Sequence, residues 1–259
     1  MLANSLELAV IGNSTVSALI DAEANWVWAC LPRLDGDPVF CRLVNQDENP
    51  QARGFFAIEL QNCVEVKQNY LNHTAILCSV MKDNQGGVIE VVDFAPRFRQ
   101  YGRLFAPMAF VRIIKKLAGH PRVVVRLRPV SDYGANSPTV TYGSNHIRFV
   151  QSGFSYRVTT DASLLHVLDE SAFYIRHSTT FILSADETMA GNIHETGRRF
   201  FEETENYWRQ WVRSLSVPFE WQSKVIRAAV TLKLNAFEDT GAVIAAMTTS
   251  IPEAAWSGR

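Results

Sequence analysis

The stretches FAIELQ (residues 56–61) and VVVRLR (residues 123–128) alternate large apolar side chains with small or polar ones, with a period of two. Such a pattern buries one face of a β-strand and leaves the other face to solvent. Similar short runs recur from residue 8 to residue 183, separated by turn sequences such as Asp83–Gly87 and Tyr142–Asn145. Because no helical pattern intervenes, we expect a mainly β fold, with antiparallel sheets packed as a sandwich over residues 1–190.

The pattern becomes helical near Gly191. An apolar stripe predicts a linker helix over residues 191–217, and its members are Phe200, Phe201, Thr204, Tyr207, Trp208, Trp211, Val212 and Leu215. Pro218 ends this helix, and a second helix is expected from Phe219 to Phe237, apolar on most of its sides. Since a helix of that kind needs neighbours on several sides, we expect residues 218–259 to be the first helix and loop of an incomplete helical domain, with apolar surface left exposed.

Composition excludes several classes of partner. The chain has 259 residues, 47% of them hydrophobic and 20% charged, which is typical of a globular protein with a core. The net charge is -1 and the basic residues are dispersed, so we expect no binding to nucleic acid or to a membrane surface. The chain shows neither a signal peptide pattern nor an apolar run long enough to span a bilayer, and we expect a cytoplasmic location.

No motif for a metal or a cofactor is present. The four cysteines lack CxxC spacing, and the six histidines are dispersed without an HExxH arrangement. The glycine-rich loops that bind nucleotide phosphates are also missing. We therefore expect no metal and no cofactor.

Carboxylates offer candidates for hydrolytic chemistry but form no recognisable pair. Glycoside hydrolysis needs two carboxyl groups, one protonated and one ionised. Asp35 and Asp37 flank Gly36 and precede Pro38, a pattern typical of a turn, and Asp93 is expected to cap a loop or form an ion pair. A complete small hydrolase that uses Asp93 or Asp132 remains a third interpretation.

Four segments resemble glycoside hydrolase family 15, in particular its bacterial glucoamylase-like and trehalase-like members. They occur in the family's order and cover most of the chain: residues 11–40, residues 91–97 (VVDFAPR), residues 207–211 (YWRQW) and residues 232–253. The resemblance implies an N-terminal β-sandwich, a linker helix and the start of an (α/α)6 barrel. The family's catalytic glutamates lie later in that barrel, so no catalytic residue is assigned here.

The resemblance implies a non-catalytic N-terminal domain of an inverting glucoamylase-like or trehalase-like hydrolase. Its partners would be the missing (α/α)6 catalytic domain and an α-glucoside such as trehalose, maltose or a glucan. We expect this chain alone to be inactive, and its exposed helices to favour a homo-oligomer.

Two loops match family positions near the mouth of the barrel. They contain Arg33 and Asp35 in the first loop, and Thr248, Thr249 and Ser250 in the second. We expect these five residues to line or brace the sugar entrance, although a purely structural role in fixing the loops would explain the match equally well.

A different class of function also fits the sequence. The chain would then be a stand-alone carbohydrate-binding or protein-interaction module. This alternative predicts that the apolar helical stripe is covered, for example by a sheet.

Overall fold

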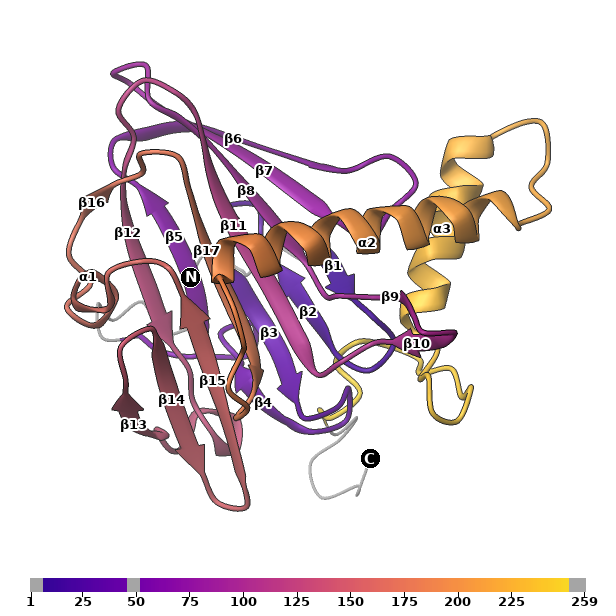
Figure 1. Ribbon diagram of the computed structural model, residues 1–259. Helices are drawn as coiled ribbons and strands as arrows, with labels where there is room; N and C mark the ends of the chain where they lie inside the picture. The colour runs from indigo at the N-terminus through magenta and orange to yellow at the C-terminus, as the bar shows by residue number, and fades with distance from the viewer. Residues whose placement is uncertain (1–6, 46–51, 252–259) are drawn as a thin grey trace.

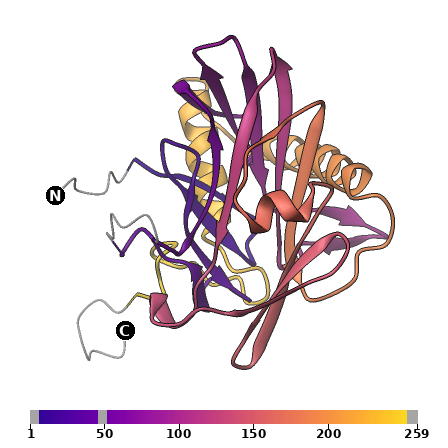
Figure 2. The same ribbon diagram turned by 90° about the vertical axis from the view of Figure 1, so that its left-hand side faces the viewer.

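The computed structural model describes residues 7–45 and 52–251, and it contains two antiparallel sheets that face each other, followed by helices (Figure 1). The view in Figure 2 shows the two sheets as separate layers. The mainly β, sandwich architecture expected from the sequence is thus confirmed. Its division into domains at residues 190 and 217 stays a prediction, and residues 252–259 of the expected barrel segment lie outside the described residues.

The first sheet contains seven strands. Its order is β1 (Ala9–Gly12), β2 (Ser17–Ile20), β3 (Trp26–Leu31), β5 (Phe55–Leu60), β12 (Arg122–Arg128) and β16 (Phe173–Tyr174), with β4 (Asp37–Phe40) also paired to β3. The alternating stretches at residues 56–61 and 123–128 lie next to each other in this sheet, since Ile58 of β5 pairs with Val125 of β12.

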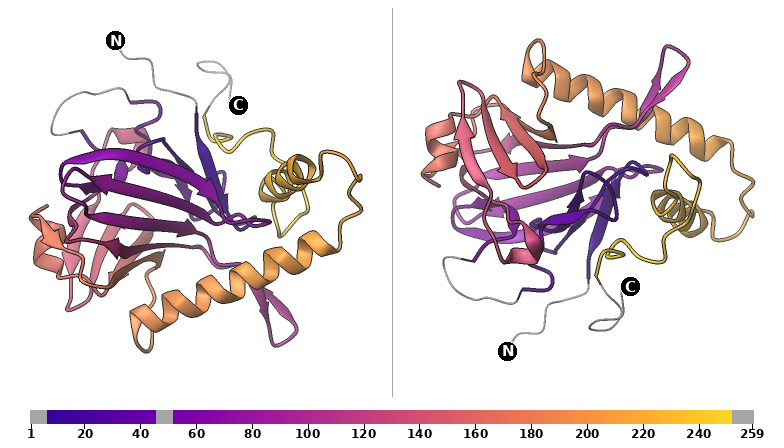
Figure 3. Two further views of the ribbon diagram at one scale, coloured as in Figure 1. Left: turned by 90° about the horizontal axis from the view of Figure 1, so that it is seen from above. Right: turned by 90° about the horizontal axis from the view of Figure 1, so that it is seen from below.

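The second sheet contains eight strands. Its order is β13 (Thr139–Tyr142), β14 (His146–Gln151), β15 (Phe154–Thr160), β17 (Ser178–Ala185), β11 (Ala109–Ala118), β8 (Val88–Phe94), β7 (Leu77–Asp83) and β6 (Cys63–Tyr70). A separate hairpin, β9 (Phe98–Gln100) with β10 (Arg103–Phe105), projects beyond the sandwich in Figure 3. Short helical turns, η1 (Asp132–Gly134) and α1 (Leu164–Leu168), connect strands.

Apolar side chains from both sheets fill the space between them. Trp26 of β3 lies edge-on to Phe56 and to Phe110, with ring centroids 5.2 Å apart in each case. Because Phe56 belongs to the first sheet and Phe110 to the second, this aromatic cluster joins the two layers.

A buried ion pair crosses the same core. Arg112 of β11 and Asp93 of β8 are cross-strand neighbours and form two hydrogen bonds, at 2.7 and 2.9 Å, and both side chains are 0% exposed. Arg112 also donates to the carbonyl oxygens of Phe56, at 2.8 Å, and Ala24, at 2.6 Å, in the opposite sheet and its β2–β3 turn. The guanidinium group therefore connects both sheets through fully formed hydrogen bonds.

Helix α2 (Ile193–Arg213) lies along the outer face of the second sheet (Figures 1 and 3). Phe200 and Ile193 pack against outward side chains of β8, β11 and β17, and Trp208 is fully buried. Gly197 permits this approach, since a Cβ there would lie 2.6 Å from the Thr180 Cγ2. The α2 stripe is therefore covered: its first half lies on the apolar outer face of the second sheet, and Trp208 and Val212 pack in the cluster that includes α3 and Leu34.

Helix α3 (Gln222–Leu234) has two opposite apolar faces with different surroundings. Ile226, Val230 and Leu234 are buried against Trp208 of α2 and Leu34 of the first sheet's loop. The opposite stripe contains Trp221, Val225, Ala228 and Leu232, which follow one another at intervals of four, three and four residues. Of these, Trp221 is 68% exposed and Leu232 is 65% exposed. The expected exposed apolar surface thus exists on α3 rather than on α2.

Strand β3 turns its two tryptophans to different faces of the first sheet. Trp26 and Trp28 are two residues apart, as residues on one face of a regular strand would be, yet they belong to different clusters. The register of β3 with β2 shifts between them, as in a β-bulge, which turns Trp28 to the outer face. Within the described residues, no helix has the length and apolar character needed to cross a membrane.

We predict that Asp93→Asn lowers the free energy of unfolding by about 3–5 kcal/mol, because it leaves a buried Arg112 without its counter-charge. Urea unfolding followed by tryptophan fluorescence measures this. Glu90→Gln is the matched control: Glu90 faces Lys115 across the same two strands, three residues away, in a partly exposed pair at 3.2 Å. Its loss should be below about 1 kcal/mol, and equal losses in the two variants would contradict the proposed role of Asp93.

Candidate functional site

Arg97 is the centre of a junction that joins the helices to the sandwich. This Arg97 junction consists of Asn13, Ser14, Arg97, Thr204 and Glu238. The Arg97 side chain, 1% exposed, donates to the Asn13 carbonyl oxygen and, at 2.7 Å, to Glu238 Oε2, and the Arg97 amide donates to Thr204 Oγ1 at 3.2 Å. One arginine thus links the β1–β2 turn, α2 and the loop after α3.

The β1–β2 turn completes the junction. Ser14 Oγ donates to the Lys233 carbonyl oxygen at 2.9 Å, and the Glu238 amide donates to the Ser14 carbonyl oxygen at 2.9 Å. The Asn13 side chain donates to the carbonyl oxygens of Pro96 and Pro107 at 3.0 and 2.7 Å. These contacts hold the C-terminal end of α3 against the first strands of the chain.

Burial and charge act in opposite directions on Glu238. Partial burial alone would raise the pKa of this carboxyl, but the hydrogen bond and the charge of Arg97, together with the charge of Lys233, lower its pKa overall. The junction is therefore strongest when Glu238 is ionised.

Arg33 and Asp35 lie in the loop between β3 and β4 and are paired with each other. Two hydrogen bonds of 3.1 Å join the guanidinium and the carboxylate, and the side chains are 56% and 58% exposed. A Cβ on Gly36, which follows Asp35 in this turn, would lie 2.3 Å from the Leu31 carbonyl oxygen, so this tight loop requires glycine. Arg33 also lies 5.9 Å from the centre of the Phe237 ring, next to the end of α3.

Thr248, Thr249 and Ser250 lie against the outer face of the first sheet. Ser250 Oγ is 3.4 Å from Cys30 Sγ, and the Ser250 carbonyl oxygen accepts from Tyr133 at 2.6 Å. Trp28 Nε1 donates to the Met247 carbonyl oxygen at 3.0 Å, and Thr249 remains exposed. The segment is therefore anchored to β3 by its backbone and by Ser250.

The structure places the two groups of entrance candidates on neighbouring parts of one surface. Leu34, beside Arg33, shares a buried cluster with Met247, beside Thr248. The cavities described below are lined by other residues. Arg33, Asp35 and Thr249 are exposed, and their role at a sugar entrance stays a prediction.

Asp93 and Asp132 do not form a catalytic pair. Asp93 is enclosed in the sandwich core with Arg112, and although burial raises its pKa, as a general acid would need, it lines neither cavity. Asp132 is exposed in η1, where its amide donates to Asp37 Oδ2 at 2.7 Å. The expected ion-pair role of Asp93 is confirmed, with its partner inside the core rather than in a loop.

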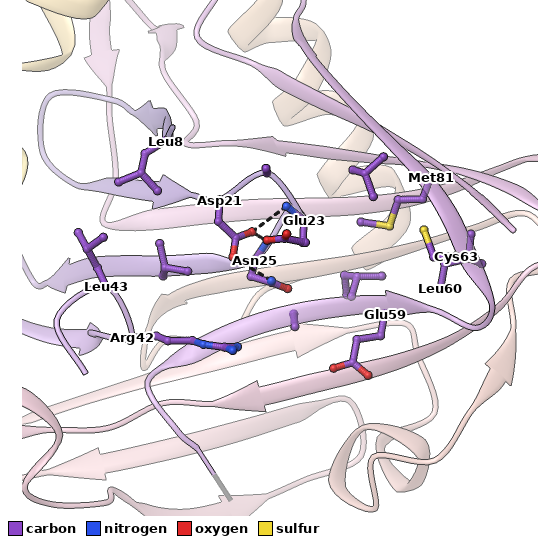
Figure 4. Close-up of a pocket in the computed structure, with 15 residues that line it drawn as sticks. Leu8, Asp21, Glu23, Asn25, Arg42, Leu43, Glu59, Leu60, Cys63 and Met81 are labelled. Atoms are coloured by element: carbon purple, nitrogen blue, oxygen red, sulfur yellow. Dashed lines mark hydrogen bonds between the residues drawn. The ribbon is translucent and has the colours of Figure 1, made fainter. Parts of the chain in front are cut away.

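A cavity of about 640 Å³ opens where β3 and β5 diverge, since these strands pair only at Trp26 and Phe56 (Figure 4). Most of its polar groups already have partners. Asp21 accepts from Asn25 at 2.9 Å, Glu59 pairs with Arg126, and Arg42 lies 4.8 Å from the Phe55 ring centre. These polar groups therefore stabilise the β2–β3 turn and the neighbouring strands.

Within the described residues, neither a metal site nor an activated thiol is formed by the groups considered next. No cluster of three or more histidine, cysteine or acidic residues there could hold a metal ion. The cysteines are unpaired, and burial raises the pKa of Cys30 and Cys41 to about 11 and that of Cys78 to about 12. These thiols are therefore protonated and poor nucleophiles.

Comparison with known proteins identifies relatives of the whole chain. Residues 3–164 match a family described as "Trehalase-like, N-terminal". A trehalase of Thermoplasma volcanium is 25% identical over 256 residues, which cover 94% of this chain and 39% of the relative. Trehalases of Thermoplasma acidophilum and Mycolicibacterium smegmatis are 26% and 25% identical, covering 88% and 94% of this chain and 39% and 40% of the relatives. The chain thus spans about two fifths of their length. No solved structure matches.

The junction predicts a pH-dependent attachment of α3. Because the pKa of Glu238 is lower in the folded chain than its ordinary value of 4.5, its contribution to stability is complete above about pH 4.5 and is lost as the pH falls through the lowered value. The difference in unfolding free energy between the unmodified chain and Glu238→Gln should therefore shrink on acidification. Glu220→Gln, at an exposed position before α3, should show no such difference, and a constant difference for Glu238→Gln would refute the prediction.

Proposed function

Because the chain belongs to the trehalase-like N-terminal family, we propose that it is the non-catalytic N-terminal domain of an inverting α-glucosidic hydrolase. In this proposal the sandwich supports an (α/α)6 barrel and shapes the mouth of its active site. The reaction would use two carboxyl groups and a water molecule. We place those carboxyl groups in the part of the related trehalases that this chain does not span.

The exposed apolar face of α3 is the main observation in favour of a missing barrel domain. One face of the helix is seated on the sandwich, and on the opposite stripe Trp221, Ala228 and Leu232 are exposed and Val225 is half-buried. Phe219 and Val243, fully exposed and 66% exposed, extend the apolar surface at the two ends of the helix. A helix that is apolar on opposite faces is typical of a buried element with neighbours on both sides, as the first helix of a barrel would be.

The Arg97 junction supports a scaffolding role. It fixes α3 through α2 and the β1–β2 turn, so the free face of α3 has a defined direction. A partner domain would meet a rigid surface, which lowers the entropic cost of docking.

We assign the entrance candidates to two roles. Ser250 and Thr248 brace the loop, since Ser250 contacts Cys30 and the Thr248 carbonyl oxygen accepts from the Ile251 amide at 2.9 Å. Arg33, Asp35 and Thr249 face solvent beside α3 and are the ones available to an α-glucoside such as trehalose, maltose or a glucan.

A stand-alone carbohydrate-binding or protein-interaction module is the second candidate function. The observation in its favour is the α2 stripe, which is covered, partly by the second sheet and partly by α3, as that alternative predicts. Under this alternative the chain would be monomeric. The free face of α3 instead favours self-association or a missing domain.

We predict that the purified chain releases no glucose from trehalose or maltose, because neither described cavity brings two free carboxyl groups together. A coupled glucose assay measures this, with a related trehalase as the positive control. Glucose release that co-purifies with the chain would overturn the proposed non-catalytic role.

We also predict that Leu232→Lys reduces self-association in size-exclusion chromatography and lowers the binding of a hydrophobic dye. The substitution places a charge in the exposed stripe without touching the seated face of α3. Val140→Lys is the matched control, an exposed apolar position on β13, and should change neither property. If the two variants behave alike, or if the unmodified chain is monomeric and binds no dye, the α3 stripe is not an interaction surface.

A further inference from the structure

A second cavity, of about 350 Å³, lies between the β9–β10 hairpin and the C-terminal half of α2. Glu203, Asn206, Tyr207, Gln210 and Trp211 line it from the helix, at spacings of three and four that place them on one side. Arg99 lines it from the hairpin. The volume lies in the lower part of the ~300–1,000 Å³ range that is typical of small-molecule sites.

Most polar side chains of this groove have no partner in residues 7–45 and 52–251, the exception being Ser214, whose hydroxyl donates to the Trp211 carbonyl oxygen at 2.7 Å. Within the described part of the chain, Arg99, Glu203, Asn206 and Gln210 are exposed and form no hydrogen bond or ion pair. The indole N–H of Trp211 likewise has no acceptor among the described residues. The cavity at β3 and β5 differs, because most of its polar groups are engaged.

The walls of the groove are rigid. Phe98 and Phe105 of the hairpin have ring centres 4.8 Å apart, and each lies 5.8 Å from Phe200 of α2. Arg97 lies 5.0 Å from the Tyr207 ring centre, and Trp211 lies edge-on to the buried Trp208. Two part-buried aromatic rings are therefore held in place beside free polar groups.

The chemistry of the lining indicates a neutral polyhydroxylated ligand. The charges of Arg99 and Glu203 balance, so an ionic ligand gains no net attraction. The amides of Asn206 and Gln210 both donate and accept, as sugar hydroxyls require, and the aromatic rings provide apolar contact for the C–H face of a pyranose ring.

We propose that this groove, defined by Arg99, Glu203, Asn206, Tyr207, Gln210 and Trp211, binds a neutral pyranose sugar as a monosaccharide or disaccharide. The site lies on α2 and the hairpin, outside the entrance candidates. It goes beyond the proposed function, which rests on the free face of α3, so either can fail without the other.

The test uses the 259-residue chain with methyl α-D-glucopyranoside and maltose as probes. Saturation-transfer NMR detects binding, and a tryptophan-fluorescence titration gives the dissociation constant. Both sugars should bind, and sorbitol, which has hydroxyls but no ring, should not. Addition of either sugar should also protect the chain's tryptophan fluorescence from quenching by acrylamide, a readout that needs no variant.

The double variant Asn206→Ala/Gln210→Ala should raise the dissociation constant about tenfold through the loss of two hydrogen-bonding groups. Alanine at exposed helical positions favours the helix, so folding is preserved. The matched control is Arg198→Ala/Glu202→Ala, two exposed positions on the same helix outside the groove, which should leave the constant unchanged. Absence of binding by both sugars, equal binding by sorbitol, or an unchanged constant in the Asn206/Gln210 variant would overturn the proposal.

Discussion

The buried pair of Asp93 and Arg112 sets the geometry of the whole molecule. Charges removed from water are tolerated only when their partners are complete, and Arg112 satisfies this through Asp93 and two carbonyl oxygens of the opposite sheet. The pair thereby fixes both the register of β8 with β11 and the approach of the two sheets. On the other face of these strands, Val92 and Val111 share a buried cluster with Ile193 and Phe200 of α2, so the strands that carry the ion pair also support the helix.

A single line of contacts then leads from the core to the surface. Strand β8 ends in Phe94 and is followed by Arg97, which contacts α2, the β1–β2 turn and the loop after α3. The direction of α3 is therefore set by the sandwich. The junction thus holds α3 and the loop after it at a defined orientation to the sandwich.

The sequence predicts the strands and helices well because their periods are strong and local. It could not predict what covers α2, since the outward apolar residues of β8, β11 and β17 become one surface only after the sheet has assembled. The burial of Arg112 does have a signal in the sequence, since it is a charged residue within the apolar run from Phe110 to Ile114. Its pairing with Asp93 depends on the register between β8 and β11, which the hydrophobic pattern of the sequence alone does not determine.

Some of the candidate surfaces could be predicted from the sequence and others could not. The two loops with the entrance candidates were found through a family resemblance, which gives positions but not contacts. Arg97 and Glu238 were missed as a pair because 141 residues separate them. The groove beside α2 was missed because Trp211 was counted only as a member of the apolar stripe, although Asn206 and Gln210 near it on the helix are exposed polar residues.

The bonds between the β1–β2 turn and the end of α3 also constrain the order of folding. Ser14 and Lys233 are 219 residues apart, so the turn must wait for nearly all of the described chain to be synthesised before it acquires this partner. Contacts of such long sequence separation slow folding, because the loop must close before the bond contributes. On the ribosome, the sandwich would therefore assemble first, with Asn13 and Ser14 still hydrated, and the emerging α3 would close the unit last.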